Sequence, residues 1–206
     1  MFFGIIKHKG ILKDKIVTSD GYQFVIEVDD IKLFQKVRKF IAINGCRLAV
    51  VKISENKIVV DVPEEISDKT NLGTLKQNMS VNCEAPVSPP EKFKNYFVLG
   101  EIHAIGKIEE IKELPDSHQM TISFPEEFKS YLIMRDLITI DGVNLNTTEL
   151  KDDSFSVRVN PLIWEKTNFT DKQCGDTVNI EFDSFSTFVV SFLETDDKEY
   201  DSISED

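Results

Sequence analysis

Cysteine and histidine, two residue types that often carry out chemistry, are few in this chain and widely spaced. Cys46, Cys83 and Cys174 form no Cys-x-x-Cys pair, which argues against a disulfide framework and a thiolate metal site. The three histidines lack the His-Glu-x-x-His spacing of a catalytic zinc site. We therefore expect no metal. Cys46 is interpreted as a small apolar residue and His103 as an outward strand position.

Composition narrows the function classes further. The 206 residues are 41% hydrophobic and 29% charged, as in globular proteins that bury a core, and the net charge of -12 disfavours nucleic-acid binding. No apolar run approaches the ~20 residues that cross a bilayer, so we expect no membrane contact and a cytoplasmic location. Residues 195–206 are strongly acidic and are interpreted as a disordered solubilising tail, with a specific acidic docking segment as the alternative.

The elements that must position any site come from an internal repeat. Several motifs recur 97 positions apart: Asn44-Gly45 as Asp141-Gly142, Lys69-Thr-Asn-Leu72 as Lys166-Thr-Asn-Phe169, and Val81-Asn-Cys-Glu84 as Val178-Asn-Ile-Glu181. Earlier motifs recur at 96, including Gly4 with Gly100 and Tyr22 with His118, so one residue is inserted between Ile122 and Arg135. The chain is therefore a duplication.

Each repeat is expected to be a small β-barrel. Segments 22–28, 58–62 and 120–124 are short, partly alternating and rich in β-branched or aromatic residues, which predicts strands. Asn44-Gly45 and Asp141-Gly142 predict hairpin turns, whereas 64–69 and 125–131 predict single helical turns. Many short strands with few helices favour a closed or nearly closed antiparallel barrel.

The domain boundaries follow from the repeat. We expect an N-terminal barrel over 1–85, a proline-containing linker over 86–95, a C-terminal barrel over 96–182, an α-helix over 183–194 and the tail over 195–206. The helix carries an apolar stripe of Phe185, Phe188, Val189, Phe192 and Leu193. The stripe either packs on its own barrel or forms a subunit contact.

Five motifs in order carry a family resemblance: Met1-Phe-Phe-Gly-Ile-Ile, Asn44-Gly-Cys-Arg-Leu, Thr70-Asn-Leu-Gly73, Ile140-Asp-Gly-Val and Val178-Asn-Ile-Glu-Phe-Asp183. Over residues 1–193 the chain resembles the riboflavin synthase α-chain, whose family includes the non-catalytic lumazine and yellow fluorescent proteins. The resemblance implies an all-β fold, a tandem duplication of a six-stranded Greek-key barrel with a C-terminal helix. It also implies a homotrimer assembled through that helix and, for the antenna proteins, a luciferase-type partner.

The resemblance implies a ligand and a reaction as well. Each barrel would offer a shallow pocket for a pteridine-like ring and its ribityl chain, filled by 6,7-dimethyl-8-ribityllumazine, riboflavin or FMN. The enzymes dismutate two lumazine molecules into riboflavin and a pyrimidine, without a metal or redox cofactor. One lumazine must lose a proton from its C7 methyl group, which requires a nearby base.

The chain departs from the enzyme pattern at several chemical positions. The two histidines of the family's His-x-x-x-x-His element are Tyr96 and Glu101 here. In an altered mechanism Glu101 could act as a base and Tyr96 as an acid. Asp183 is retained from the family pattern. The family's Cys-Leu-Thr is Arg47-Leu-Ala49, and its Ser-Leu-Thr is Asn144-Leu-Asn146. Because cooperating catalytic groups act as a unit, losing several of them usually abolishes catalysis.

Several positions are expected to contact the ligand by this resemblance. Arg47 would either bind a ligand phosphate, which would favour FMN, or point to solvent. Asn144 and Asn146 would hydrogen-bond a pteridine edge through their amides. Alternatively, Asn146 caps a turn and Asn144 faces water. The expected ligand-binding positions are Cys46, Arg47, Leu48, Ala49, Val62, Thr70, Asn144, Leu145, Asn146, Asn160 and Thr167.

Three functions remain open at this point. The first is a non-catalytic lumazine- or flavin-binding protein, which explains why scaffold residues persist while the acid, base and nucleophile positions do not. The second is a divergent riboflavin synthase, favoured by Asp183 and the apolar helix. The third is a structural relative that binds no flavin and uses its barrels or acidic tail for protein contacts.

Overall fold

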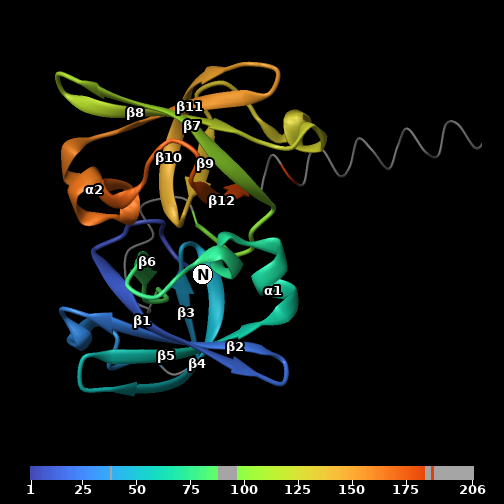
Figure 1. Ribbon diagram of the computed structural model, residues 1–206. Helices are drawn as coiled ribbons and strands as arrows, with labels where there is room; N and C mark the ends of the chain where they lie inside the picture. The colour runs from blue at the N-terminus through green and yellow to red at the C-terminus, as the bar shows by residue number, and fades with distance from the viewer. Residues whose placement is uncertain (38, 88–96, 184–186, 188–206) are drawn as a thin grey trace, which may run out of the picture.

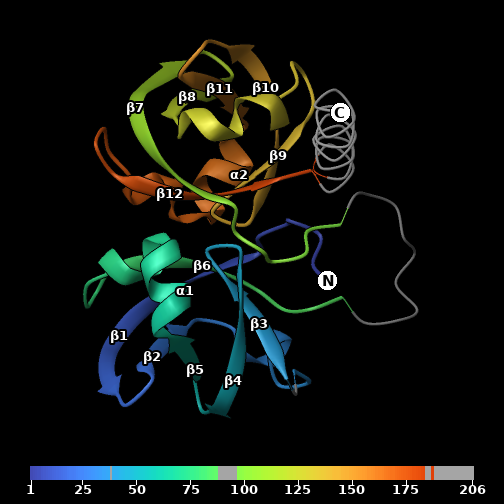
Figure 2. The same cartoon turned by 90° about the vertical axis from the view of Figure 1, so that its right-hand side faces the viewer.

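The computed structural model describes residues 1–37, 39–87, 97–183 and 187, and these form two closed, six-stranded antiparallel barrels stacked one on the other (Figures 1 and 2). In the N-terminal barrel the strand order is β1-β2-β5-β4-β3-β6, with bounds β1 His8–Thr18, β2 Gly21–Val28, β3 Phe40–Ile43, β4 Cys46–Ser54, β5 Lys57–Pro63 and β6 Ser80–Glu84. This confirms the predicted barrel.

The C-terminal barrel repeats this arrangement strand for strand. Around the barrel the order is β7-β8-β11-β10-β9-β12, with bounds β7 Ala104–Leu114, β8 Ser117–Ser123, β9 Leu137–Ile140, β10 Val143–Leu150, β11 Ser154–Val159 and β12 Thr177–Phe182. The tandem duplication is therefore confirmed. Short helices lie outside the strands: α1 Glu64–Lys69 and α2 Pro161–Lys166, and the 3-10 helices η1 Ile31–Leu33, η2 Asn71–Thr74, η3 Glu126–Tyr131 and η4 Asn168–Asp171.

Irregularities in the strands recur with the repeat. The register shifts after Leu12 in β1 and after Ile108 in β7, and again after Val50 in β4 and after Thr147 in β10. Such bulges bend and twist a strand, which lets a short sheet curl until its edges meet. Closure leaves each barrel without a free edge strand.

Both predicted hairpins have the expected backbone. Asn44 and Gly45 have φ of 45° and 78°, and Asp141 and Gly142 have φ of 46° and 80°. Two successive positive φ values define the turn that matches the twist of adjacent strands, and Asn, Asp and Gly tolerate them best. The helical turns expected over 64–69 and 125–131 are α1 and η3.

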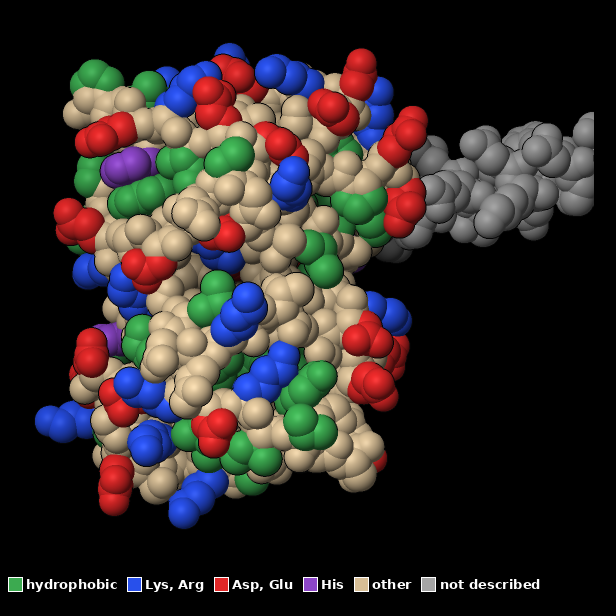
Figure 3. All heavy atoms as spheres, viewed as in Figure 1, with side chains coloured by type: hydrophobic (Ala, Val, Ile, Leu, Met, Phe, Trp, Pro, Cys, Tyr) green, Lys and Arg blue, Asp and Glu red, His purple; other side chains and the backbone are tan. Residues whose placement is uncertain are grey.

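Little of the predicted C-terminal helix and tail falls within the described residues. Thr187 is helical, and its N–H donates to Asp183 O at 3.0 Å, as at the start of a helix. The apolar stripe and the acidic tail lie outside the described residues. Within the described part of the chain, no helix is long and apolar enough to cross a membrane. On the face seen in Figure 3, acidic and basic side chains are interspersed over both barrels.

The two halves exchange short segments. Residues 2–6 and 98–102, here called the exchange segments, meet at a Phe2–Val98 bridge and then pass to opposite barrels. Gly4 O accepts the Asn144 N–H of β10, and Gly100 O accepts the Arg47 N–H of β4, both at 3.0 Å. The first segment thus places Ile6 in the core of the C-terminal barrel. In return Ile102 packs against the N-terminal core.

Two buried glutamates hold the exchange segments in place. Glu84 accepts the N–H groups of Phe3 and Gly4 at 2.9 and 3.2 Å, and Glu181 accepts those of Leu99 and Gly100 at 2.7 and 3.1 Å. Burial raises the pKa of each carboxyl to about 7, although the backbone N–H donors oppose this shift.

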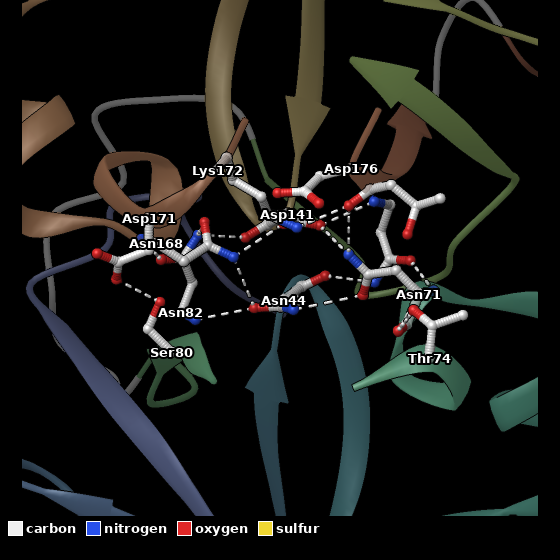
Figure 4. A network of polar contacts seen from close by, with 12 residues as sticks. Asn44, Asn71, Thr74, Ser80, Asn82, Asp141, Asn168, Asp171, Lys172 and Asp176 are labelled. Atoms are coloured by element: carbon white, nitrogen blue, oxygen red, sulfur yellow. Dashed lines mark hydrogen bonds and ion pairs between the residues drawn. The ribbon is translucent and has the colours of Figure 1, made fainter. Parts of the chain in front are cut away.

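A buried network of side chains joins the barrels where the hairpin turns meet (Figure 4). Asn71 N–H donates to Asn179 Oδ1 at 2.6 Å, and in the symmetric contact Asn168 N–H donates to Asn82 Oδ1 at 2.7 Å. Because buried polar groups need partners, these contacts fix how the barrels sit on each other. The network comprises Asn44, Asn71, Asn82, Asp141, Asn168 and Asn179, all buried.

The network is symmetric except at its centre. Asp141 stands where the first repeat has Asn44, and its carboxylate accepts the side-chain N–H groups of Asn71 and Asn168 at 2.8 and 2.9 Å. Lys172, 12% exposed, balances the charge at 3.3 Å. The position equivalent to Lys172 in the first repeat is Leu75. The ion pair of Asp141 and Lys172 therefore corresponds to the neutral residues Asn44 and Leu75 in the other half.

Removing the cation should therefore destabilise the protein far more than the matched change in the other half. We expect Lys172→Met to lower the free energy of unfolding by about 3–5 kcal/mol, since it leaves the Asp141 carboxylate buried without a counter-ion. Leu75→Met, a swap of similar volume, should cost less than about 1.5 kcal/mol. Urea unfolding followed by circular dichroism measures both. Equal losses would show that the ion pair does not stabilise the interface.

The two raised carboxyl pKa values predict a pH dependence. Each folded-state pKa of about 7 exceeds the usual value of 4.5, so the contribution to stability is complete below about pH 4.5 and is lost as the pH rises through 7. Each carboxyl can account for at most about 1.4 kcal/mol per pH unit. We expect the free energy of unfolding of Glu84→Gln/Glu181→Gln to fall less between pH 5 and 8 than that of the parent. Parallel curves would contradict the assignment.

Candidate functional site

A cleft of about 280 Å³ opens on the C-terminal barrel where the first exchange segment crosses it. Ligand sites for small molecules begin at roughly 300 Å³, and this cleft is near that size. One wall is the exchange segment, a second is β9 and β10, and a third is α2. The lining residues are Phe3, Gly4, Ile5, Ile6, Leu137, Val143, Asn144 and Ile163.

Local structure fixes two of these walls. The Asn160 side chain caps α2 by accepting the Ile163 N–H at 2.9 Å, and Pro161 at the first turn suits the backbone there. Thr167 closes the helix by donating its hydroxyl to Trp164 O at 3.3 Å. These caps hold Ile163 against the cleft.

Glycine is required where the exchange segment meets β10. Gly4 has a φ of 69°, and a Cβ at this position would lie 2.7 Å from Asn144 Cβ. Only glycine combines this backbone with such an approach. The close contact places the wall directly beside the Asn144 side chain.

Asn144 supplies an unpaired acceptor in an otherwise apolar cleft. Its Oδ1 is buried and has no hydrogen-bond partner among the described residues. Buried polar atoms are nearly always paired in folded proteins, so an orphan at a cleft indicates a ligand or water partner. A few such polar groups among apolar walls are typical of small-molecule sites. A ring N–H in the cleft reaches this oxygen once the Asn144 side chain turns toward it.

A small hollow adjoins the cleft and shares Leu137 and Asn144 with it. Asp183 lies in this hollow together with Glu181. His103, expected to point outward, is instead half-buried beside Phe182: its Nδ1 accepts the Phe182 N–H at 3.2 Å, and burial lowers its pKa. His103 therefore serves the packing of β12.

The equivalent place on the N-terminal barrel is built differently. Arg47 occupies the position of Asn144, and Glu101 occupies that of Ile5. The two side chains form an ion pair, with Arg47 Nη2 3.4 Å from Glu101 Oε1. The guanidinium carbon lies 5.7 Å from the centre of the Phe40 ring, whose counterpart in the cleft is Leu137. The structure thus pairs Arg47 with a carboxylate of its own chain.

Most other predicted ligand positions belong to the barrels themselves. Cys46, Leu48, Val62 and Leu145 are buried in the two cores, and burial raises the pKa of the Cys46 thiol to about 12. Thr70 is buried as well and donates to Ile66 O at 2.6 Å. These side chains shape the scaffold.

Two further predicted positions, Ala49 and Asn146, are exposed and do not line the cleft. Ala49 lies on the outer face of β4, and Asn146 Nδ2 reaches Arg135 O at 3.4 Å. Tyr96 is not among the described residues. Of the predicted ligand positions, Asn144 lines the cleft directly, while Asn160 and Thr167 position its wall. Among the residues that the structure describes, no cluster of three or more His, Cys, Asp or Glu side chains could hold a metal ion.

Sequence reasoning did not find four parts of the cleft: residues 3–6, Leu137, Val143 and Ile163. The repeat does contain one signal, because Gly4 and Gly100 occupy equivalent places in both halves. A glycine kept by both copies indicates a close backbone approach. It does not reveal which barrel the segment touches.

Comparison with known proteins agrees with the fold and the repeat. The model of the lumazine binding domain family matches residues 3–86 and again 99–183. Riboflavin synthase of Actinobacillus pleuropneumoniae is 33% identical over 195 residues, covering 94% of this chain and 90% of that protein. Riboflavin synthase of Bacillus subtilis (strain 168) is 28% identical with the same coverage.

Solved structures of LumP are similar as well. LumP complexed with riboflavin superimposes with a TM-score of 0.81 at 25% identity, covering 88% of this chain and 99% of LumP. LumP complexed with flavin mononucleotide gives a TM-score of 0.76 at the same identity and coverage. With two matched domains that span both barrels, this chain belongs to the lumazine-binding family of riboflavin synthases and lumazine proteins.

Proposed function

We propose that the protein binds 6,7-dimethyl-8-ribityllumazine, riboflavin or FMN in the C-terminal cleft and does not convert it. The buried, unpartnered Asn144 Oδ1 carries this proposal. Lumazine and flavin rings share an imide N–H between two carbonyls, and this donor matches the orphan acceptor. The apolar walls suit the flat faces of such rings. LumP, similar in fold, has been crystallised with all three ligands.

The lining of the cleft argues against chemistry. The synthase reaction requires a base for a methyl proton, and none of the eight lining side chains can take up or release a proton at neutral pH. Glu101 is paired with Arg47 on the other barrel, and Cys46 is a buried thiol with a raised pKa. These walls can hold a ring, and a proton donor or acceptor would have to come from the adjoining hollow, where Glu181 and Asp183 lie.

A divergent riboflavin synthase is the second candidate. The named relatives, such as that of Actinobacillus pleuropneumoniae, are riboflavin synthases, and Asp183 lies in the hollow beside the cleft. In this case Asp183 would act as the base across the shared wall at Leu137 and Asn144. The two candidates differ in turnover.

Mixing the protein with 6,7-dimethyl-8-ribityllumazine separates them. We expect a polarised lumazine emission, because the bound ring tumbles with the protein, and a spectrum that stays constant with time. Absorption and fluorescence anisotropy measure both. Growth of a riboflavin spectrum at the expense of lumazine, absent in Asp183→Asn, would establish the synthase instead. Emission identical to that of free lumazine would refute binding of this ligand.

A pair of matched variants tests the site itself. Ile163→Trp fills the cleft from α2, so we expect it to weaken lumazine binding at least tenfold. Ile66→Trp makes the same change on α1 of the other barrel and should leave the affinity within about twofold of the parent, because a wall-filling effect is local. Anisotropy titrations measure the affinities, and thermal melting shows whether each variant folds. Equal weakening by both would place the site elsewhere.

A further inference from the structure

The two barrels present the same three walls with different chemistry. In the C-terminal barrel the exchange segment offers Ile5 and β10 offers Asn144, and the cleft lies between them. In the N-terminal barrel the corresponding residues are Glu101 and Arg47. The backbone is alike at both places, since a Cβ on Gly4 would meet Asn144 Cβ at 2.7 Å and one on Gly100 would meet Arg47 Cβ at 2.8 Å. The difference therefore lies in the side chains.

Arg47 links two sides of its site, the exchange segment and β3. Its backbone N–H donates to Gly100 O, its guanidinium pairs with Glu101, and the same group lies over the Phe40 ring. Phe40 is the counterpart of Leu137, a lining residue of the open cleft. The side chain thus spans the place where a ring would enter.

The ion pair is exposed and contributes little to stability by itself. The Arg47 and Glu101 side chains are 45% and 59% exposed, and exposed ion pairs are weak. The obstacle to a ligand is desolvation. A flat ring seated over this site would cover a guanidinium and a carboxylate together and remove their water, which is unfavourable unless every charge finds a new partner. The C-terminal cleft imposes no such cost on a ring.

We propose that the Arg47–Glu101 pair closes the N-terminal site, so that each chain holds one ligand, in its C-terminal barrel. This inference rests on the proposed binding function and adds its stoichiometry and the residues that set it. Arg47 is a specificity-determining residue that excludes ligand from one of two equivalent sites. The carboxylate of Glu101 also neutralises the guanidinium that a ligand phosphate would otherwise find.

Exchanging the two pairs of side chains tests the proposal. Isothermal titration with riboflavin should give one site in the parent and two in Arg47→Asn/Glu101→Ile, which copies Asn144 and Ile5. The reciprocal variant Asn144→Arg/Ile5→Glu should lose its site, with affinity at least tenfold lower. Carrying all four substitutions should restore one site, now in the N-terminal barrel. Circular dichroism melting shows whether each variant folds.

The outcomes separate this inference from the binding function. Two sites in the parent, or one site in Arg47→Asn/Glu101→Ile, would overturn the closing role of Arg47 while leaving binding intact. Retention of the parent affinity in Asn144→Arg/Ile5→Glu would also overturn it, because the ligand would then occupy another place. An absence of binding in the parent and in every variant would refute the proposed function, and the stoichiometry with it.

Discussion

The structure depends on the contact between two hairpin turns at the centre of the molecule. A Cβ on Gly45 would lie 2.7 Å from Gly142 N, and a Cβ on Gly142 would lie 2.7 Å from Gly45 N. Both glycines have positive φ, so the turns require glycine for conformation and for approach alike. Around this contact the buried side-chain network fixes the barrels, and only then can each exchange segment reach the opposite barrel. The cleft exists because a segment from the first repeat forms a wall on the second.

Duplication made a symmetric scaffold, and divergence then made its two halves unequal. At the interface a neutral Asn44 and Leu75 correspond to the charged Asp141 and Lys172. Three N–H groups, from Asn71, Asn168 and Asn179, converge on the Asp141 carboxylate, which only accepts hydrogen bonds. An asparagine at position 141 would point its own side-chain NH2 group at one of these three N–H donors. The network is therefore better satisfied with one carboxylate and one cation than with six amides.

The sequence was sufficient for the fold because the repeat, the turn residues and the strand pattern agree. Asn44-Gly45 and Asp141-Gly142 identify the hairpins through local backbone chemistry. The site was harder. Leu145 alternates with Asn144 and Asn146, so strand periodicity assigns the leucine to the core and Asn144 to the outer face; Leu48 is buried at the equivalent position of β4.

The exchange of segments could not be read from the sequence, for a physical reason. Residues 2–6 and 98–102 are repeat equivalents and would satisfy either barrel by pattern. Their destination is set by the approach of Gly4 to Asn144 and of Gly100 to Arg47, a property of how the barrels stack. Ile163 joins the cleft for the same reason, because α2 becomes a wall only when the foreign segment lies across from it.

Loss of catalysis and retention of binding place different demands on such a site. Dismutation needs two rings held together with an acid, a base and a nucleophile, and these groups contribute as a unit. Binding one ring needs apolar walls and a few oriented polar atoms. The family's histidine and thiol positions are Glu101 and Arg47 in this chain, and by our proposal their ion pair lies where a second ring would sit. Under the proposed function, the same two positions thus account both for the missing catalytic groups of the family and for a single open site in each chain.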